Sequence, residues 1–439
     1  MQTASKKVIR GWAMYDWANS VYNLVITTTF FPIYYTIVTR KQFGGETVSF
    51  LGRKFINTSL YDYSFALAYL LIALLYPVLT SVADSRGNKK VFMRFFCYMG
   101  STGCALLYFF NGTNLWLGIL CLMIASMGFV GSVVFYNAFL PEIAAPEDRD
   151  RVSAKGFSYG YIGSVILQII GFVLVTVMED KLQAMRITFL LVGIWWASFA
   201  QITFSVLPET KSGGKISSGI IGESFSEMKK VYGEIRKLPV LKMFLRAFFF
   251  YSMGVQTVML AATLFGSKLL QLADTKLIVT VVIIQLVAIP GAVGVSRLSE
   301  KFGNLRVLIG IIIFWILICL AAYYTAYYKE QGGNPEFGFY ALAVAVGLVM
   351  GGIQSLSRST YSKLMPETRD TASYFSYYDF TEKLAIVIGM FSFGFIEELT
   401  GSMKNSVLSL IIFFLIGFFW LMRAQGLNKS VNRQLSTVN

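Results

Sequence analysis

The chain has 439 residues, of which 55% are hydrophobic and 14% are charged, and its formal net charge is +14. Because soluble domains carry roughly 25% charged residues, this composition excludes a soluble protein and indicates an integral membrane protein. If the N-terminus lies in the cytoplasm, most of the 38 Lys and Arg residues fall in the inward loops, as the positive-inside rule predicts. The positive charge therefore does not require a nucleic-acid partner, and we expect none.

Twelve apolar stretches are each long enough to cross a bilayer as a helix, which needs about 20 residues. The first half of the chain contains the spans 17–39, 62–83, 91–111, 114–139, 154–178 and 186–207. The second half contains the spans 243–268, 276–298, 305–327, 337–359, 371–396 and 404–424. Because lipid offers no hydrogen-bond partners to an open backbone, we expect every span to be helical and the protein to be an all-α membrane protein.

Two connections between spans are long. The outward loop 40–61 is predicted only as a polar cap. The inward segment 208–242 contains apolar residues at helical spacing among lysines and arginines, which indicates a helix on the inner membrane surface. The alternative for this segment is a solvated linker with a chance periodicity. The chain is thus predicted to consist of a first bundle (1–207), this linker (208–242), a second bundle (243–424) and a cytoplasmic tail (425–439).

A short charged turn follows the second span of each half. Ala83-Asp84-Ser85-Arg86-Gly87-Asn88-Lys89-Lys90 has the same order of acid, base, glycine, asparagine and base as Ser299-Glu300-Lys301-Phe302-Gly303-Asn304-Leu305-Arg306. Phe157-Ser158-Tyr159 and Phe375-Ser376-Tyr377 repeat at nearly the same interval. Two repeats at one period indicate that the chain consists of two copies of one unit of roughly 200 residues.

The first turn resembles the signature Gly-x-Leu-Ala-Asp-Arg-x-Gly-Arg-Lys of the major facilitator superfamily. This resemblance implies twelve transmembrane helices in two pseudo-symmetric six-helix bundles, with Asp84 facing the start of the eleventh span and Glu300 facing the start of the fifth. A carboxylate at a helix N-terminus is stabilised by about 0.3–1 kcal/mol. The resemblance implies that the gating residues are Asp84, Arg86, Lys89, Glu300 and Lys301. The alternative is a pair of solvated turns whose charges set only the topology.

Polar and ionisable side chains inside the spans are the candidate functional residues, because each costs free energy to insert. The candidates for solute binding are Asn19, Asn23, Asn137, Tyr161, Gln256, Gln354, Arg358, Tyr378 and Lys383. Individually such residues also serve as contacts between helices, but their origin in both halves favours a shared site between two bundles. The candidates for proton coupling are Glu382, Asp379 and Asp16.

The eleventh span carries the most costly group of charges. Asp379 and Lys383 are four residues apart, so they lie on one helical face and can neutralise each other. Glu382 is then left without a local partner, and an unpaired carboxyl group in such surroundings can titrate. The alternative is a structural bridge between Glu382 and Arg358 of the tenth span.

Four motifs spread over the chain narrow the resemblance. They are Trp12–Ser20 (WAMYDWANS), Tyr136–Pro141 (YNAFLP), Gly254–Thr257 (GVQT) and Gly351–Ser359 (GGIQSLSRS). These motifs are similar to the branch that contains the vacuolar amino-acid effluxers of autophagy and their bacterial relatives, which implies amino-acid transport. This chain departs from the branch at three positions: Met253 stands where the branch has an acid, Met390 where it has a proline, and Glu382 where it has a small residue. An acid is thus absent from the seventh span and present in the eleventh, which is consistent with a titrating carboxyl group that has moved between these spans.

We therefore expect a secondary transporter that moves a small polar or zwitterionic solute, an amino acid or a short peptide, by alternating access, with efflux and proton coupling as further expectations. The alternatives are an exporter of multiple drugs or amphipathic compounds and a non-transporting membrane receptor. The chain has no histidine, the commonest proton shuttle and metal ligand, and no phosphate-binding loop Gly-x4-Gly-Lys-Ser/Thr. We expect no enzyme activity, no cofactor and no metal.

The expected location is the bacterial inner membrane, where the chain would be an integral multi-pass protein with both termini in the cytoplasm. Its expected partners are the solute, protons and membrane lipid. We expect a monomer. The four cysteines all fall inside apolar stretches, where they pack as small hydrophobic residues and indicate no disulfide framework.

Overall fold

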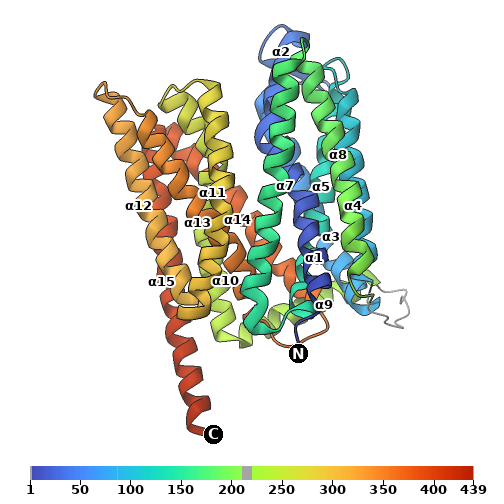
Figure 1. The fold of residues 1–439 in the computed structure, drawn as a ribbon, viewed down its shortest axis with the longest axis vertical. Helices are drawn as coiled ribbons and strands as arrows, with labels where there is room; N and C mark the ends of the chain where they lie inside the picture. The colour runs from blue at the N-terminus through green and yellow to red at the C-terminus, as the bar shows by residue number, and fades with distance from the viewer. Residues whose placement is uncertain (1, 87, 210–219, 439) are drawn as a thin grey trace.

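The computed structural model describes residues 2–86, 88–209 and 220–438. Two groups of long helices stand side by side, and both termini lie at the same end of the molecule (Figure 1). We call this end the terminal side and the opposite end the far side. The first half of the chain forms one group and the second half forms the other, so the repeat seen in the sequence corresponds to two bundles (Figure 1).

The first half begins with one continuous span. It consists of α1 (Lys6–Val21), the π-helix η1 (Tyr22–Phe30) and α2 (Phe31–Phe43). The following long helices are α3 (Asn57–Arg86), α4 (Lys89–Leu106) with the 3-10 turn η2 (Leu107–Phe109), α5 (Leu115–Ala138), α7 (Arg149–Val177) and α8 (Lys181–Val206). Two short turns, α6 (Leu140–Ile143) and η3 (Pro146–Asp148), connect α5 to α7 at the terminal side.

The second half repeats this plan after the linker helix α9 (Ile220–Lys237). Its long helices are α10 (Pro239–Leu264) with the π-turn η4 (Phe265–Leu269), α11 (Asp274–Phe302), α12 (Asn304–Glu330), α13 (Glu336–Leu364), α14 (Thr371–Thr400) and α15 (Met403–Val438). The predicted tail 425–439 is therefore helical as far as residue 438, as a continuation of α15.

The expected all-α membrane fold is confirmed. Each predicted span falls on one of these helices, but most of the helices extend several residues beyond the predicted bounds. The largest differences are at the start of the first span, where α1 begins at Lys6 rather than at residue 17, and at the end of the last, where α15 continues to Val438 rather than to residue 424. Within the described residues, nine helices are long and apolar enough to cross a membrane, or up to ten if the bent pair Lys229–Lys237 and Pro239–Met259 forms one span. The number of spans is thus at least nine on this criterion.

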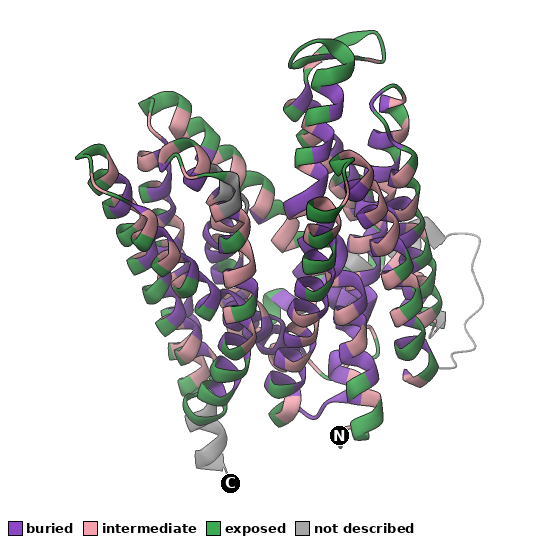
Figure 2. Cartoon of the chain, turned by 45° about the horizontal axis from the view of Figure 1, so that its top comes forward, coloured by how far each residue is buried: buried purple, intermediate pink, exposed green. Residues whose placement is uncertain are grey.

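The outer surface of both bundles is apolar, as expected for helices in lipid. Buried residues line the inward faces of the helices, and exposed residues cover the periphery (Figure 2). Among the exposed residues are large hydrophobic side chains such as Leu74, Phe95, Trp116, Leu317 and Phe391. An apolar exposed surface of this extent is typical of a protein that faces hydrocarbon rather than water.

The first span contains an unusually long π-helix. Thr27, Thr28 and Thr29 each donate a side-chain hydrogen bond to the carbonyl oxygen five residues earlier, at 3.4, 2.7 and 2.9 Å. These bonds satisfy carbonyl groups in a helix type that is rare and is often found at functional sites. The π-helix begins shortly after Asn19, so it sets the rotation of this part of the span relative to α2.

Both long connections contain regular structure in their described residues, and residues 210–219 of the inward segment lie outside these. The loop 40–61, expected only as a polar cap, contains an antiparallel hairpin of β1 (Thr47–Phe50) and β2 (Arg53–Ile56). Its two-residue turn, Leu51-Gly52, has positive φ at both positions (50° and 75°), as a twisted hairpin requires.

The linker helix α9 bends by 107° from α10 and packs against α3 and α14. Val231 and Ile235 are buried there, and the hydroxyl of Tyr374 donates to Glu234 at 2.7 Å. This helix therefore contacts both halves directly, in addition to any contact with the membrane surface.

Candidate functional site

Asp84 joins the two halves at the terminal side. Near the end of α3, its carboxylate accepts hydrogen bonds from the backbone N–H groups of Ala372 (3.1 Å) and Ser373 (2.8 Å) in the first turn of α14. The hydroxyl of Ser373 donates to the same carboxylate at 2.9 Å. The first N–H groups of a helix have no partner within the helix, and the positive end of the helix dipole favours an anion. Asp84 thus lies at the start of the eleventh span, where the resemblance placed it.

Lys89 reinforces this contact from the start of α4. Its ammonium group lies 3.2 Å from the carboxylate of Asp84, forms an ion pair with Glu142 and donates to the hydroxyl of Thr371 at 2.7 Å. Thr371 in turn donates to Glu142 at 2.8 Å. Because Lys89 is buried, its charge is matched by two carboxylates rather than by water. Sequence reasoning did not identify Glu142, whose position in a short turn gave no periodic signal.

A second contact of the same kind involves Asp150, at the start of α7. Its carboxylate accepts hydrogen bonds from Ser299 (2.8 Å) and Asn304 (2.7 Å), which lie at the junction of α11 and α12. The ammonium group of Lys363, near the end of α13, donates to it at 2.6 Å. Asp84 and Asp150 therefore close the terminal side at two symmetric places, each with a carboxylate of the first half.

The structure differs from the expected gating residues in the second half. Glu300 is exposed and forms no ion pair within the described part of the chain, and Lys301 is exposed beside the ring of Phe302. Adjacent residues of a helix point about 100° apart, and in α11 it is Ser299 that faces α7. The expectation that Glu300 contacts the fifth span is therefore replaced by the contact of Ser299 with Asp150. The side chain of Arg86 lies outside the described residues.

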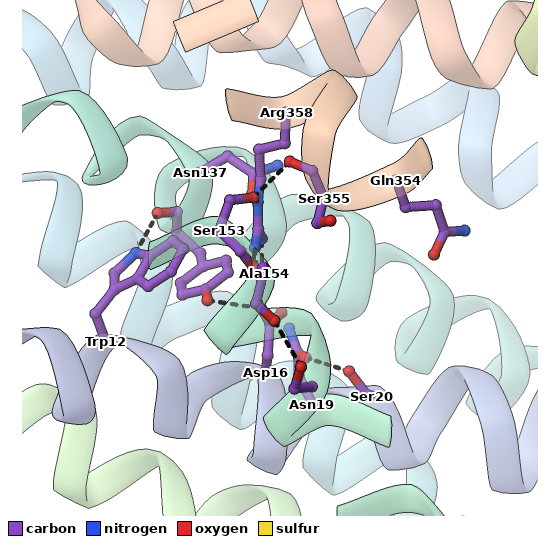
Figure 3. A network of polar contacts seen from close by, with 12 residues as sticks. Trp12, Asp16, Asn19, Ser20, Asn137, Ser153, Ala154, Gln354, Ser355 and Arg358 are labelled. Carbon is purple, nitrogen blue, oxygen red and sulfur yellow. Dashed lines mark hydrogen bonds and ion pairs between the residues drawn. The ribbon is translucent and has the colours of Figure 1, made fainter. Parts of the chain in front are cut away.

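Arg358 forms the densest polar contact between the halves (Figure 3). It projects from α13 into a set of side chains that all belong to the first half, and we call this set the arginine box. The box consists of Trp12, Asp16, Tyr136, Asn137, Ser153 and Phe157. Arg358 is 3% exposed and Asp16 is 7% exposed, so the guanidinium group and its counter-ion are both removed from water.

The bonds of Arg358 differ in quality. Its Nε and Nη2 donate to the hydroxyl and carbonyl oxygens of Ser153, both at 2.9 Å, and its Nη1 donates to the amide oxygen of Asn137 at 3.2 Å. The two bonds to Asp16 are 3.4 Å long, beyond the usual 2.7–2.9 Å of a good charged pair. The best partner of Asp16 is instead the hydroxyl of Tyr136, at 2.7 Å.

Aromatic rings enclose the remaining faces of the guanidinium group. Its carbon lies 4.3 Å from the ring centre of Phe157, 5.0 Å from that of Trp12 and 5.4 Å from that of Tyr136. These distances are in the range of cation–π attraction. Gly156 allows the box to close, because a Cβ atom there would lie 2.9 Å from the Tyr136 hydroxyl and 3.0 Å from Arg358 Nη2.

The charges of the eleventh span pair differently from the expectation. Lys383 forms an ion pair with Glu382 at 2.9 Å rather than with Asp379, and Gln256 of α10 donates to Glu382 at 3.1 Å. Asp379 is 2% exposed, and its Oδ2 atom has no hydrogen-bond partner among the described residues. The alternative bridge from Glu382 to Arg358 is not formed, because Arg358 is held in the box. Asp379 therefore has no ion pair in the described part of the chain, and its carboxyl group interacts with the side chain of Asn137 instead.

The Glu382–Lys383 pair lies between the halves. The ammonium group of Lys383 is 5.8 Å from the ring centre of Tyr69, which belongs to α3 of the first half. The side chains of Lys383 and Glu382 are 15% and 20% exposed, so the pair remains accessible. Tyr378, one turn away, stacks on Phe248 at 4.3 Å and is buried within the second half.

The remaining candidates have separate environments. The hydroxyl of Tyr161 donates to Gln354 across the two halves at 2.9 Å. Asn19 is buried beside the box, and its amide nitrogen has no hydrogen-bond partner in the described part of the chain. Asn23 is exposed on the π-helix. Asn19 and Asn23 therefore do not share one environment, because the π-helix begins between them.

One further amide bridge lies nearer the far side. Gln285 of α11 donates to Gln168 of α7 at 3.0 Å, and Gln168 donates to Thr29 at 2.9 Å. The other described side-chain hydrogen bonds between the halves lie either level with the Tyr161–Gln354 bond or nearer to the terminal side. The described contacts therefore close the terminal side of the interface.

The site has no arrangement typical of an enzyme within the described residues. The sequence Gly156-Phe157-Ser158-Tyr159-Gly160 has the spacing Gly-x-Ser-x-Gly of a hydrolase nucleophile, which requires a sharp turn between a strand and a helix. Here it lies inside α7, and Ser158 donates its hydroxyl to the carbonyl oxygen of Ala154. No group of His, Cys, Asp and Glu residues in the described ranges could hold a metal ion.

Comparison with known proteins agrees with this geometry. The family model described as "Vacuole effluxer Atg22 like" matches residues 4–433. The MFS-type transporter YxiO of Bacillus subtilis is 32% identical over 417 residues, which cover 92% of each chain. Autophagy-related protein 22-1 of Penicillium rubens is 25% identical over 523 residues, which cover 93% of this chain and 88% of that one.

Solved structures show the same fold at low sequence identity. The human organic anion transporter MFSD10 superposes with a TM-score of 0.71 at 13% identity, covering 95% of this chain and 99% of that chain. The major facilitator transporter FucP in its outward conformation superposes with a TM-score of 0.67 at 13% identity, with coverages of 95% and 99%. These likenesses establish the major facilitator fold.

Proposed function

The chain belongs to the family of Atg22-like vacuole effluxers and is a major facilitator transporter, and we propose that its solute is a small zwitterion, an amino acid or a short peptide. In this mechanism the two bundles rock about a site between them and expose it to one side at a time. The contacts of Asp84 and Asp150 seal the terminal side. With its terminal side closed, the structure thus corresponds to the carrier state that opens at the far side.

We propose that the terminal side is cytoplasmic. The inward loops assigned from the sequence carry most of the Lys and Arg residues, and positive loops stay in the cytoplasm. The described conformation is then outward-facing, with both termini in the cytoplasm of a bacterial cell and the chain in the inner membrane. The terminal contacts would break, and far-side contacts would form, when the carrier turns inward.

The observation that carries the choice of a zwitterion is the accessible Glu382–Lys383 pair. An amino group of the solute can take the place of Lys383 beside Glu382, and a carboxylate of the solute can take the place of Glu382 beside Lys383. Gln256 already donates to Glu382, and it would fix the orientation of the bound group. A solute of one charge alone would leave one member of the pair unmatched in a poorly hydrated site.

We propose that proton coupling, where it occurs, uses Asp379. Its Oδ2 atom is buried without a hydrogen-bond partner among the described residues, and its one recorded side-chain hydrogen bond is to the neutral Asn137. Glu382, by contrast, is bound by both Lys383 and Gln256. The other charged groups near Asp379 are Glu382 and Lys383 on its own helix and Arg358 on α13. The tyrosines that face it are Tyr76 of α3 and Tyr361 of α13.

Counterflow in liposomes tests this function. Purified protein is reconstituted into vesicles loaded with unlabelled amino acid, and entry of labelled amino acid is measured against vesicles without protein. We expect counterflow with zwitterionic amino acids and none with monocarboxylates or simple amines of the same size. Counterflow of amphipathic cations instead of amino acids would favour a multidrug exporter. Binding without any counterflow would favour a receptor.

The proposed direction of net transport is efflux, in line with the description of the family. In inside-out membrane vesicles the cytoplasmic side faces the medium, so an exporter accumulates solute in the lumen. Accumulation only in right-side-out vesicles would establish uptake.

A further inference from the structure

The arginine box belongs entirely to one half of the molecule. Trp12 and Asp16 lie on α1, Tyr136 and Asn137 on α5, and Ser153 and Phe157 on α7. The second half contributes the side chain of Arg358 and the carbonyl oxygen of Ser355, which accepts a hydrogen bond from Ser153 at 2.7 Å (Figure 3). Arg358 is the only charged side chain that the second half contributes to the hydrogen bonds and ring contacts described for this cluster. If the bundles move as rigid bodies, Arg358 leaves with α13 and the box stays intact.

The box lies on the terminal side of the interface. Arg358 is six residues from the end of α13, and Ser153 is four residues from the start of α7. Opening of the terminal side therefore withdraws Arg358 and exposes the box to the solution on that side. It leaves the carboxylate of Asp16 without its counter-ion and three aromatic rings without their cation.

Such a vacated box has the chemistry of a site for an organic cation. A carboxylate together with faces of Trp, Tyr and Phe is the arrangement that recognises ammonium groups through ion pairing and cation–π attraction. The 3.4 Å distances between Arg358 and Asp16 show that the guanidinium group does not fill the position next to the carboxylate closely. A smaller ammonium group can approach Asp16 more closely than the planar fork does.

We propose that, in the state open at the terminal side, the arginine box binds the ammonium group of the solute, and that Arg358 is an internal competitor that displaces it when this side closes. This inference rests on the proposed function, because it names where the cationic end of a zwitterion binds before the carrier turns. The return of Arg358 pushes the ammonium group out of the box toward the Glu382–Lys383 pair. Loading at the terminal side and release at the far side follow from this competition.

Removal of Arg358 gives a direct test with methylammonium as the probe. We expect methylammonium chloride, compared with potassium chloride at the same ionic strength, to raise the unfolding temperature of Arg358→Ala and to leave that of the unmodified protein unchanged. The upward shift should disappear when Asp16→Asn is added to Arg358→Ala. An absent shift in Arg358→Ala, or an equal shift in the double variant, would overturn the proposal.

Arg246→Ala is the matched control. Arg246 lies over the ring of Trp420 at 4.7 Å and forms no ion pair within the described part of the chain. Its removal also vacates an aromatic face but uncovers no carboxylate at that ring. We expect methylammonium to leave the unfolding temperature of this variant unchanged, and a shift as large as that of Arg358→Ala would show that the effect is not specific to the box.

A second measurement does not depend on the folding of Arg358→Ala. In a protein that retains Arg358, methylammonium should favour the state open at the terminal side and speed the alkylation of a cysteine placed at Ser362, which is fully buried on α13. Asp16→Asn should remove this acceleration. No acceleration in the parent protein would overturn the proposal. Because methylammonium is not a zwitterion, these results are independent of whether amino acids show counterflow.

Discussion

Replacement of Asp84 by asparagine should release the terminal side. The carboxylate binds two backbone N–H groups and one hydroxyl at the start of α14, and hydrogen bonds to charged groups contribute about 1.5–3 kcal/mol. Asparagine keeps one acceptor oxygen but loses the charge, and with it the interaction with the helix N-terminus, worth roughly 0.3–1 kcal/mol or up to about 2 kcal/mol when buried. We expect Asp84→Asn to weaken the sealed state by about 2 kcal/mol, or roughly 30-fold in population.

Alkylation of a cysteine at Ser362 measures this change. Ser362 is fully buried near the end of α13, and its carbonyl oxygen accepts a hydrogen bond from Arg149 of α7 at 2.6 Å. The four natural cysteines are buried, so they should contribute little background. When opening is rapid compared with alkylation, the rate is proportional to the open fraction. Asp84→Asn should therefore raise the rate for Ser362→Cys by roughly 30-fold.

Glu300→Gln provides the control for charge removal at the same side. Glu300 occupies the matching place in the second charged turn, but it is exposed and has no ion pair in the described ranges. We expect its replacement to leave the alkylation rate unchanged. An unchanged rate in Asp84→Asn, or an equal increase in Glu300→Gln, would refute the idea that Asp84 seals this side.

Three further predictions follow from the geometry. Asp150→Asn should raise the alkylation rate of Ser362→Cys at least as much as Asp84→Asn does, because it removes the carboxylate that forms an ion pair with Lys363 and leaves only the hydrogen bond from Lys363 to Asn304. A smaller effect would contradict the idea that Asp84 and Asp150 both hold the terminal side closed. Gly156→Ala should lower stability by about 1–3 kcal/mol in thermal unfolding, since its Cβ atom would crowd Tyr136 and Arg358. Gly294→Ala on α11, where a Cβ atom meets nothing within 4 Å, is the control and should be neutral or stabilising. Asp379→Asn should abolish the response of transport to a pH gradient but preserve counterflow exchange. Glu382→Gln should instead keep the pH response and weaken solute binding. The reverse pattern would show that Glu382 carries the coupled proton.

The features predicted well from the sequence are those set by local properties of the chain. The length of an apolar stretch fixes whether a helix spans the bilayer, so every predicted span lies on an observed helix. The helix ends were predicted less well, because several helices continue through polar residues beyond the apolar stretch. The charged turn after α3 was identifiable because its residues are contiguous. Its partner at the start of α14 was expected only through the resemblance to the major facilitator superfamily.

The features missed by the sequence depend on how helices rotate against one another. The spacing of Asp379 and Lys383 allowed an ion pair, but Lys383 bonds to Glu382 instead. Adjacent residues on a helix can pair when long side chains bend to the same side, and the amide of Gln256 from α10 favours this arrangement. The contact between α11 and α7 was mispredicted for the same reason. Adjacent residues point in different directions around a helix, and the rotation of α11 places Ser299 rather than Glu300 against Asp150 of α7.

The partners of Arg358 could not be ranked from sequence for a related reason. Asp16 and Asn137 were both candidates, yet the closest bonds of Arg358 are to Ser153, a small residue that belongs to none of the motifs identified in the sequence. One of these bonds is to the backbone carbonyl oxygen of Ser153. Because every residue has such an oxygen, the residue type cannot indicate which one will bind the arginine. The aromatic residues of the box carried no separate signal in a chain with 38 phenylalanines and 24 tyrosines.

The buried charges explain why an empty carrier should change state only rarely. Separation of the halves breaks the Asp16–Arg358 pair and both carboxylate contacts at the terminal side. Loss of the partner of a buried charge costs about 3–5 kcal/mol, and rehydration compensates for only part of this in a narrow opening. A cation that enters the box restores the charge balance of Asp16 and lowers the cost of opening. The same contacts that hold the structure closed therefore make opening dependent on the ligand, which is the condition for transport without leakage.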